Sequence, residues 1–120
     1  MSHILLIDDD EDMLAMAGRW LEKSGYKVTK ATSGEEGLSL IKADIPDLVL
    51  LDYAMPVMDG PAVLKAIRSD EDIKDIPVLY RTGMDDPDFD IQDEQYHADG
   101  FVSKSEGRPS LIKAVESILS

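Results

Sequence analysis

The sequence contains no cysteine, which excludes disulfide bridges and thiolate metal sites. No apolar run approaches the roughly 20 residues that a membrane-spanning helix needs. The N-terminal stretch MSHILLIDDD also lacks the basic region and the long apolar core of a signal peptide. We therefore expect a soluble, cytoplasmic protein that has no membrane partner.

Basic residues are scarce as well. The chain has 12 lysines and arginines against 25 aspartates and glutamates, which gives a formal net charge of −13. Because contacts with nucleic-acid phosphates need a basic surface, direct binding to DNA or RNA is not expected. A chain of 120 residues is long enough for one domain with one core, so we treat 1–120 as a single domain.

Short apolar runs alternate along the chain with segments of helical periodicity. Near-continuous apolar strands between helices predict an α/β fold, a parallel five-stranded sheet covered on both faces in a three-layer (βα)5 sandwich. The acidic stretch 84–99 predicts a fourth helix that is short or mobile. The predicted strands are 3–7, 26–31, 47–51, 76–80 and 100–103, and the other predicted helices are 13–23, 33–43, 59–69 and 109–119.

The five acidic residues after the first apolar run divide into two groups. Asp10, Glu11 and Asp12 precede a helical segment, where acidic side chains cap free N–H groups and suit the helix dipole. Asp8 and Asp9 come directly after the strand itself. We therefore expect a ligand-binding role only for Asp8 and Asp9.

In an open α/β sheet, ligands bind outside the carboxyl ends of the strands. The predicted strands deliver Asp8 and Asp9, Asp52, Thr82 and Lys104 to that edge. In the flavodoxin-like order 2-1-3-4-5 the first and third strands are neighbours, so three carboxylates converge. Three close carboxylates stay ionised only with a cation. Oxygen ligands with room for water favour Mg²⁺ over Ca²⁺, with Mn²⁺ as an alternative.

A carboxylate held beside Mg²⁺ can attack a phosphoryl group and form an acyl phosphate. A lysine and a hydroxyl that face the carboxylate can neutralise and hydrogen-bond the phosphoryl oxygens. These components resemble the receiver domain of response regulators in two-component signalling, and they are similar to single-domain chemotaxis receivers. The resemblance covers essentially the whole chain, through LLIDDDED, VTKATSGEEGL, PDLVLLDYAMPVMDG, IPVLYRTG and ADGFVSK.

The resemblance implies a role for each residue of the acidic site. Asp52 would be the phosphoacceptor and a metal ligand. Asp9 would bind Mg²⁺ directly, Asp8 would act mainly through water, and the backbone carbonyl of Ala54 would be a further ligand.

The resemblance also implies a switch. Thr82 would hydrogen-bond the phosphoryl group, Lys104 would pair with it, and the aromatic ring of Phe101 would change rotamer. The donor would be a histidine kinase or a histidine phosphotransfer protein. The output would be altered binding of an unidentified protein at the face of helix four, strand five and helix five. Such a domain catalyses only its own phosphorylation and dephosphorylation.

Two departures from the family pattern leave alternatives open. Ser105 stands where most receivers have a proline in a cis peptide, and Arg81 replaces a residue that is usually apolar. Both would also suit a degenerate receiver that binds partners without phosphorylation. A phosphatase of the haloacid-dehalogenase type is a further alternative, because Asp8-x-Asp10 matches its motif, but Asp12 stands where Thr or Val belongs.

Overall fold

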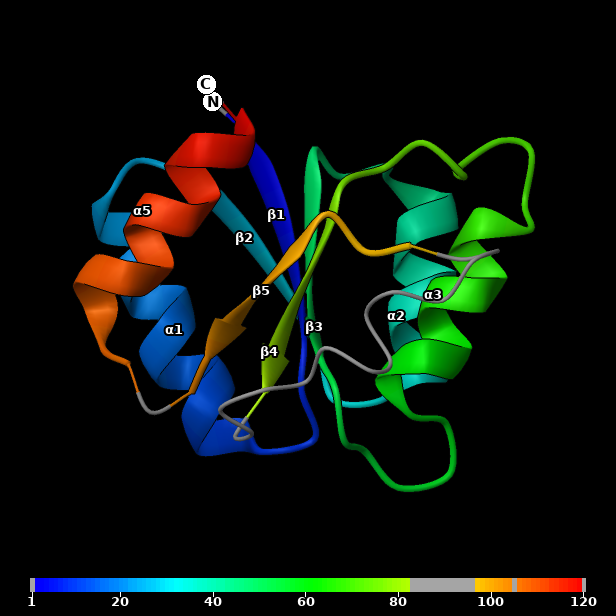
Figure 1. The fold of residues 1–120 in the computed structure, drawn as a ribbon, viewed down its shortest axis with the longest axis horizontal. Coiled ribbons are helices and arrows are strands. Elements are labelled where there is room, and N and C mark those ends of the chain that lie inside the picture. Colours follow the sequence, from blue (N-terminus) through cyan, green and yellow to red (C-terminus); the bar gives the residue numbers. More distant parts are fainter. Residues whose placement is uncertain (1, 83–96, 105, 120) are drawn as a thin grey trace.

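A parallel sheet of five strands runs through the centre of the molecule in the order β2-β1-β3-β4-β5, as predicted. The computed structural model describes residues 2–82, 97–104 and 106–119. Helices α1 and α5 cover one face of the sheet, and α2 and α3 cover the other (Figure 1). The strands are β1 (His3–Ile7), β2 (Lys27–Ala31), β3 (Leu48–Asp52), β4 (Val78–Thr82) and β5 (Gly100–Ser103), and the helices are α1 (Glu11–Lys23), α2 (Gly34–Ala43), α3 (Gly60–Arg68) and α5 (Arg108–Leu119).

The fourth strand lies two residues later than its predicted range of 76–80. Proline has no N–H to give to a sheet, so Pro77 precedes β4 and contributes only its carbonyl, which accepts from Val49. At the other end, pairing with β3 and β5 extends the strand through Arg81 and Thr82. The strand therefore places both of these residues at the carboxyl edge of the sheet. The predicted fourth helix lies largely outside the described residues, as does Ser105.

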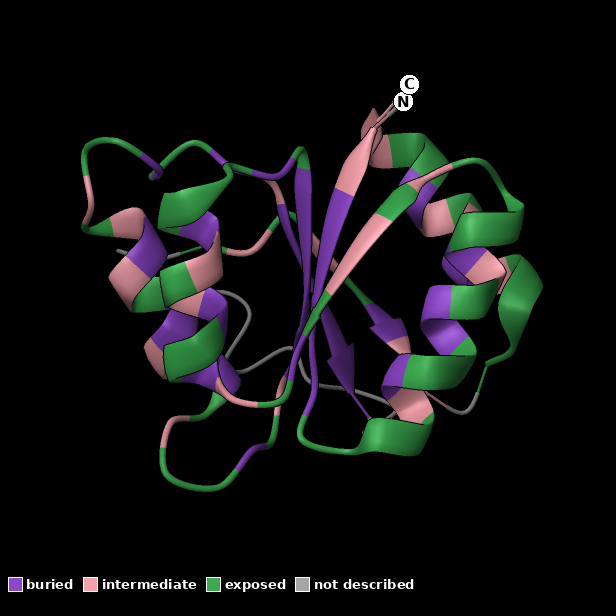
Figure 2. Cartoon of the chain, turned by 180° about the vertical axis from the view of Figure 1, so that it is seen from behind, coloured by how far each residue is buried: buried purple, intermediate pink, exposed green. Residues whose placement is uncertain are grey.

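Two apolar clusters sandwich the sheet, one against each pair of helices. Figure 2 shows the strands coloured largely as buried, between helices that carry both buried and exposed positions. Side chains alternate between the faces along each strand. In β1, for example, Ile4 and Leu6 face the α1/α5 cluster, whereas Leu5 and Ile7 face the α2/α3 cluster. All five residues of β3 are buried. This alternation decides on which face each residue at the end of a strand emerges.

The helix starts follow the predicted capping chemistry. The Asp10 carboxylate accepts hydrogen bonds from the N–H groups of Asp12 (2.9 Å) and Met13 (3.3 Å), so α1 begins two residues before its predicted start. Ser33 caps α2 by accepting from the N–H of Glu36. The Glu36 carboxylate accepts in turn from the N–H of Thr32 at 2.7 Å. The acidic residues after Asp9 thus belong to the helix, as predicted.

Candidate functional site

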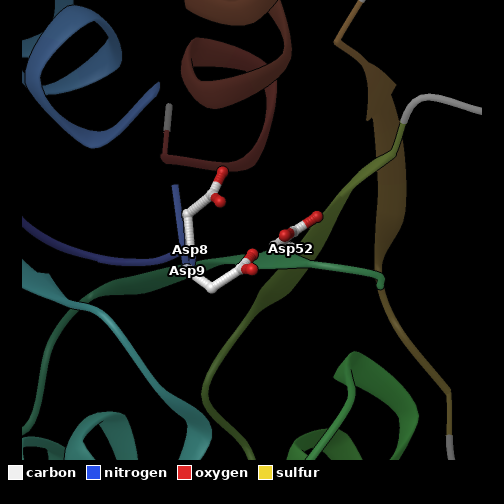
Figure 3. Close-up of side chains that lie close together, drawn as sticks. All are labelled: Asp8, Asp9 and Asp52. Atoms are coloured by element: carbon white, nitrogen blue, oxygen red, sulfur yellow. The ribbon is translucent and has the colours of Figure 1, made fainter. Parts of the chain in front are cut away.

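Three carboxylates gather where β1 and β3 end (Figure 3). Ile7 and Leu51 are paired in the sheet, and Asp8 and Asp52 come one residue later on the two strands. One oxygen from each of Asp8, Asp9 and Asp52 can be chosen so that all lie within 4.8 Å of one another. Asp8 and Asp52 are buried, at 5% and 4% exposure, and Asp9 is exposed. The convergence expected from the strand order is therefore present.

The backbone just after Asp52 is held by hydrogen bonds to β4 and to the start of α3. The N–H of Tyr53 donates to the carbonyl of Arg81, and the N–H of Gly60 donates to the carbonyl of Tyr53, both at 2.9 Å. A Cβ atom at Gly60 would lie only 2.7 Å from the Asp52 carbonyl oxygen. A glycine is thus needed where α3 begins, because the backbone returns directly onto the end of β3.

Asp8 has one oxygen committed to the local backbone and one turned toward the site. Its Oδ1 accepts from the N–H of Asp10 at 2.9 Å, and its own N–H donates to the carbonyl of Ala31. The buried Oδ2 forms an ion pair with the ammonium of Lys104 at 3.1 Å and has no other partner among the described residues. A buried carboxylate oxygen in this condition is available to a further cation.

Lys104 reaches the two buried carboxylates from β5. Its Nζ lies 3.1 Å from Asp8 Oδ2 and 3.0 Å from Asp52 Oδ1. Its backbone N–H donates to the carbonyl of Thr82 at 2.7 Å, which continues the pairing of β4 and β5 one residue beyond Ser103. Burial opposes the charge on Lys104, but the two carboxylates outweigh burial and raise its pKa. The lysine is therefore a fixed cation of the site.

The environment of the acidic site disfavours the ionised form of Asp52. Burial is the main reason that the pKa of Asp52 rises from 3.8 to about 7. The charge of Asp8 and a hydrogen bond with Asp9 raise this pKa as well, whereas Lys104 lowers it. The lysine thus does not offset burial and the two neighbouring carboxylates together. The donor set is all oxygen and includes the under-bonded Asp8 Oδ2, so these residues fit a hard divalent cation such as Mg²⁺.

The other residues expected from the sequence lie at different depths. Thr82 ends β4 and is buried at the same edge, at 3% exposure. Ala54 is exposed in the loop two residues beyond Asp52. Phe101 lies on β5 and is 45% exposed. Phe101 lines an open surface pocket of about 330 Å³ against α5, together with Lys113 and Ala114.

Two residues near the site were not identified from the sequence. Gly60 is the last residue of the segment PDLVLLDYAMPVMDG. Its Asp-Gly pair predicts a turn, but it does not predict the close return of the backbone onto Asp52. Val57 is 98% exposed in the same loop and has a φ of 67°, a left-handed value that β-branched residues rarely adopt. No pattern in the sequence marks this conformation, because valine ordinarily predicts strand.

Residues 4–116 match the family described as the response regulator receiver domain. The chain belongs to this family. It is 32% identical over 120 residues to the response regulator SaeR of Staphylococcus aureus (strain USA300). That match covers all of this chain and 51% of SaeR, so the chain spans about half the length of the curated relatives it matches.

Solved receiver structures agree with this assignment. The chemotaxis response regulator CheY4 of Vibrio cholerae is 28% identical, with a TM-score of 0.91 over 98% of both chains. The N-terminal domain of a response regulator receiver protein from Methanoculleus marisnigri JR1 is 33% identical. Its TM-score is 0.83, over 100% of this chain and 98% of that one. The predicted flavodoxin-like fold and the two-component signalling family are thus confirmed, and receiver domains are signalling domains rather than conventional enzymes.

None of the described helices combines the length and the apolar character needed to cross a membrane.

Proposed function

We propose that this receiver is a phosphorylation-dependent switch in which Asp52 accepts a phosphoryl group from a histidine kinase or a histidine phosphotransfer protein. The observation that carries the proposal is the double contact of Lys104 with Asp8 and Asp52 beside a third carboxylate. Ion pairs that serve only to stabilise a fold usually contain as many positive as negative groups. This group has more carboxylates than cations and stands at the carboxyl edge of the sheet, where ligands bind in α/β folds.

The transfer is a displacement at phosphorus. A carboxylate oxygen of Asp52 attacks the phosphorus atom, and a new P–O bond forms as the P–N bond of phosphohistidine breaks. The electron pair of that bond leaves with the imidazole nitrogen. A Mg²⁺ held by Asp8, Asp9, Asp52 and the Ala54 carbonyl would neutralise charge on the phosphoryl oxygens.

The protein's own groups prepare Asp52 for this step. Lys104 already contacts the Asp52 carboxylate and favours the ionised form that attacks. The hydroxyl of Thr82 would donate a hydrogen bond to the phosphoryl group. The added charge would draw Thr82 and the half-exposed Phe101 inward and shift a two-state equilibrium at the surface of β5 and α5, where an output protein would bind.

The test uses the purified chain with Mg²⁺ and acetyl phosphate, followed by intact-mass measurement. We expect the mass of one phosphoryl group to be added to the wild-type chain and to the control Asp12→Asn, whose side chain is exposed in the first turn of α1. Asp52→Asn should abolish the adduct.

The alternatives give other results. A degenerate receiver would form no adduct with either acetyl phosphate or a phosphorylated histidine phosphotransfer protein. A phosphatase of the haloacid-dehalogenase type would hydrolyse phosphodonors steadily in Asp52→Asn and would lose this activity in Asp8→Asn. Either outcome would overturn the proposal.

A further inference from the structure

A buried arginine stands beside the phosphoacceptor position in the sheet. Arg81 on β4 is the register partner of Asp52 on β3. Leu79 and Leu50, two residues earlier on these strands, both belong to the α1/α5 cluster. Because side chains alternate along a strand, Arg81 and Asp52 emerge on this same face as cross-strand neighbours. Asp8 continues the same row on β1. The sheet thus aligns two carboxylates and a guanidinium.

Arg81 is buried, and the described residues offer it no hydrogen-bonded counter-ion. It is 4% exposed, and its Nε has no hydrogen-bond partner among the described residues. Burial lowers the pKa of Arg81, while the charges of Asp8 and Asp52 act in the opposite direction. Its electrostatic partners are thus the site carboxylates, yet the described chain shows ion pairs to them only from Lys104. A buried charge in this condition is costly unless a further group binds it.

The charge of the site indicates which group that would be. Three carboxylates, Lys104 and Arg81 give a formal net charge of −1, and a divalent cation changes it to +1. Phosphorylation replaces the single charge of Asp52 by about −2, so the loaded, phosphorylated site is close to neutral. Without Arg81 the same state would carry about −1. Arg81 therefore favours the phosphorylated state and opposes cation binding before phosphorylation.

We propose that Arg81 is a second phosphoryl-binding cation of this receiver, whose guanidinium donates hydrogen bonds to an oxygen of the phosphoryl group on Asp52. This proposal rests on the proposed function of Asp52. A guanidinium suits the role because its planar set of N–H donors matches phosphate oxygens, and charge-assisted bonds of this kind are strong. The buried Nε–H and the adjacent carboxylate row put the donor and the future acceptor on one face of the sheet.

The experiment compares the wild type with Arg81→Met, which fills the buried space without a charge, and with Arg81→Lys, which keeps the charge. Arg19→Met makes the same change at an exposed position of α1 and serves as the matched control. Circular dichroism first shows that each variant folds. Intact mass then gives the rate of phosphorylation by acetyl phosphate and the lifetime of the adduct after the donor is removed. Calorimetry gives the Mg²⁺ affinity of each unphosphorylated variant.

We expect Arg81→Met to slow phosphorylation or to shorten the adduct lifetime by about tenfold, and at the same time to bind Mg²⁺ several-fold more tightly. Arg81→Lys should lie between Arg81→Met and the wild type, and Arg19→Met should match the wild type. A merely structural arginine would change the melting temperature without moving these two readouts in opposite directions.

The possible failures are distinguishable. If the wild type forms an adduct and Arg81→Met forms it at the same rate, with the same lifetime, the role of Arg81 is overturned and that of Asp52 stands. Weaker Mg²⁺ binding in Arg81→Met would also overturn it. If the wild type forms no adduct with any donor, both proposals fall. Should Arg81→Met not fold, Arg81→Lys decides, because unchanged kinetics and Mg²⁺ affinity in that variant, together with an unchanged Arg19→Met, would contradict a role that depends on the fork of the guanidinium.

Discussion

The arginines at the two ends of strands β4 and β5 differ in how fully they are hydrogen-bonded. Before the strands begin, Arg68 donates to the carbonyls of His97, Lys74 and Ile76 at 2.6–3.0 Å and to the carboxylate of Asp99 at 3.1 Å. Asp99 accepts in addition from the N–H of Val78. Where the strands end, the Nε of Arg81 has no hydrogen-bond partner in the part of the chain that the structure describes.

This difference separates a structural ion pair from a site. The Arg68 guanidinium connects α3 to the start of β4 and β5, and each of its nitrogens donates a hydrogen bond within the chain. At the other end, Asp8 Oδ2 has the ion pair with Lys104 as its one contact within the described residues, Arg81 Nε donates no hydrogen bond there, and the pKa of Asp52 is raised to about 7. The proposed cation and phosphoryl sites rest on these groups, which stand at the ligand-binding edge of an α/β sheet.

The largest effect on stability should come from the satisfied end. Arg68→Ala removes four charge-assisted hydrogen bonds from a side chain that is only 16% exposed. We expect the free energy of unfolding to fall by about 4 kcal/mol. Urea denaturation followed by circular dichroism measures it, with the exposed Arg19→Ala as the control, which should change stability by less than about 0.5 kcal/mol. Equal effects of the two variants would remove the contrast.

A smaller effect of opposite sign is expected at the unsatisfied end. In the metal-free protein, folded Asp52 keeps its proton up to about pH 7, whereas the unfolded chain releases it near 3.8. Stability therefore falls as the pH rises through this window. Asp52→Asn removes this loss, so the variant should be more stable than the wild type by about 2 kcal/mol at pH 8 and nearly equal to it at pH 4. The favourable contact with Lys104 is already contained in this raised pKa, so its loss in asparagine is part of the expected difference.

Thermal unfolding in the presence of a chelator, over pH 4 to 8, measures this difference. An Asp52→Asn variant that is less stable than the wild type at pH 8 would show that the carboxylate is a structural partner of Lys104, like Asp99 for Arg68. Added Mg²⁺ should stabilise the wild type more than the variant, because the cation binds the ionised carboxylate.

The finest contrast lies between neighbouring acidic residues. Asp9 contributes to the carboxylate cluster, whereas Asp12 lies in the first turn of α1. Asp9→Ala should weaken Mg²⁺ binding by about tenfold or more, which corresponds to about 1.4 kcal/mol. Asp12→Ala should leave the affinity within a factor of two. Calorimetric titration with Mg²⁺ measures both, and similar losses in the two variants would mean that bulk acidity, rather than a built site, attracts the cation.

Most of the architecture could be predicted because it depends on local patterns. The apolar runs around Ile4 and Val49 and the caps at Asp10 and Ser33 lie within a few residues of the elements they determine. The prediction for β4 was wrong at both ends. Whether Pro77 and Arg81 belong to the strand depends on hydrogen bonding with the neighbouring strands, which the sequence alone does not show. In the sequence, Arg81 is only a departure from an apolar pattern. Its burial could not be predicted, because it depends on the pairing of β3 and β5 on both sides of it.

The sequence by itself determined which chemical groups reach the carboxyl edge of the sheet, because strand ends and turns are set by residues close together in the chain. Asp8, Asp9, Asp52, Thr82 and Lys104 were all found in this way. Only the tertiary structure decided how those groups share their charge. Burial, the alternation of faces and the strand register bring residues from four strands into one small volume. There the pKa of Asp52 rises, Lys104 contacts two carboxylates, and Arg81 has no hydrogen-bonded counter-ion among the described residues.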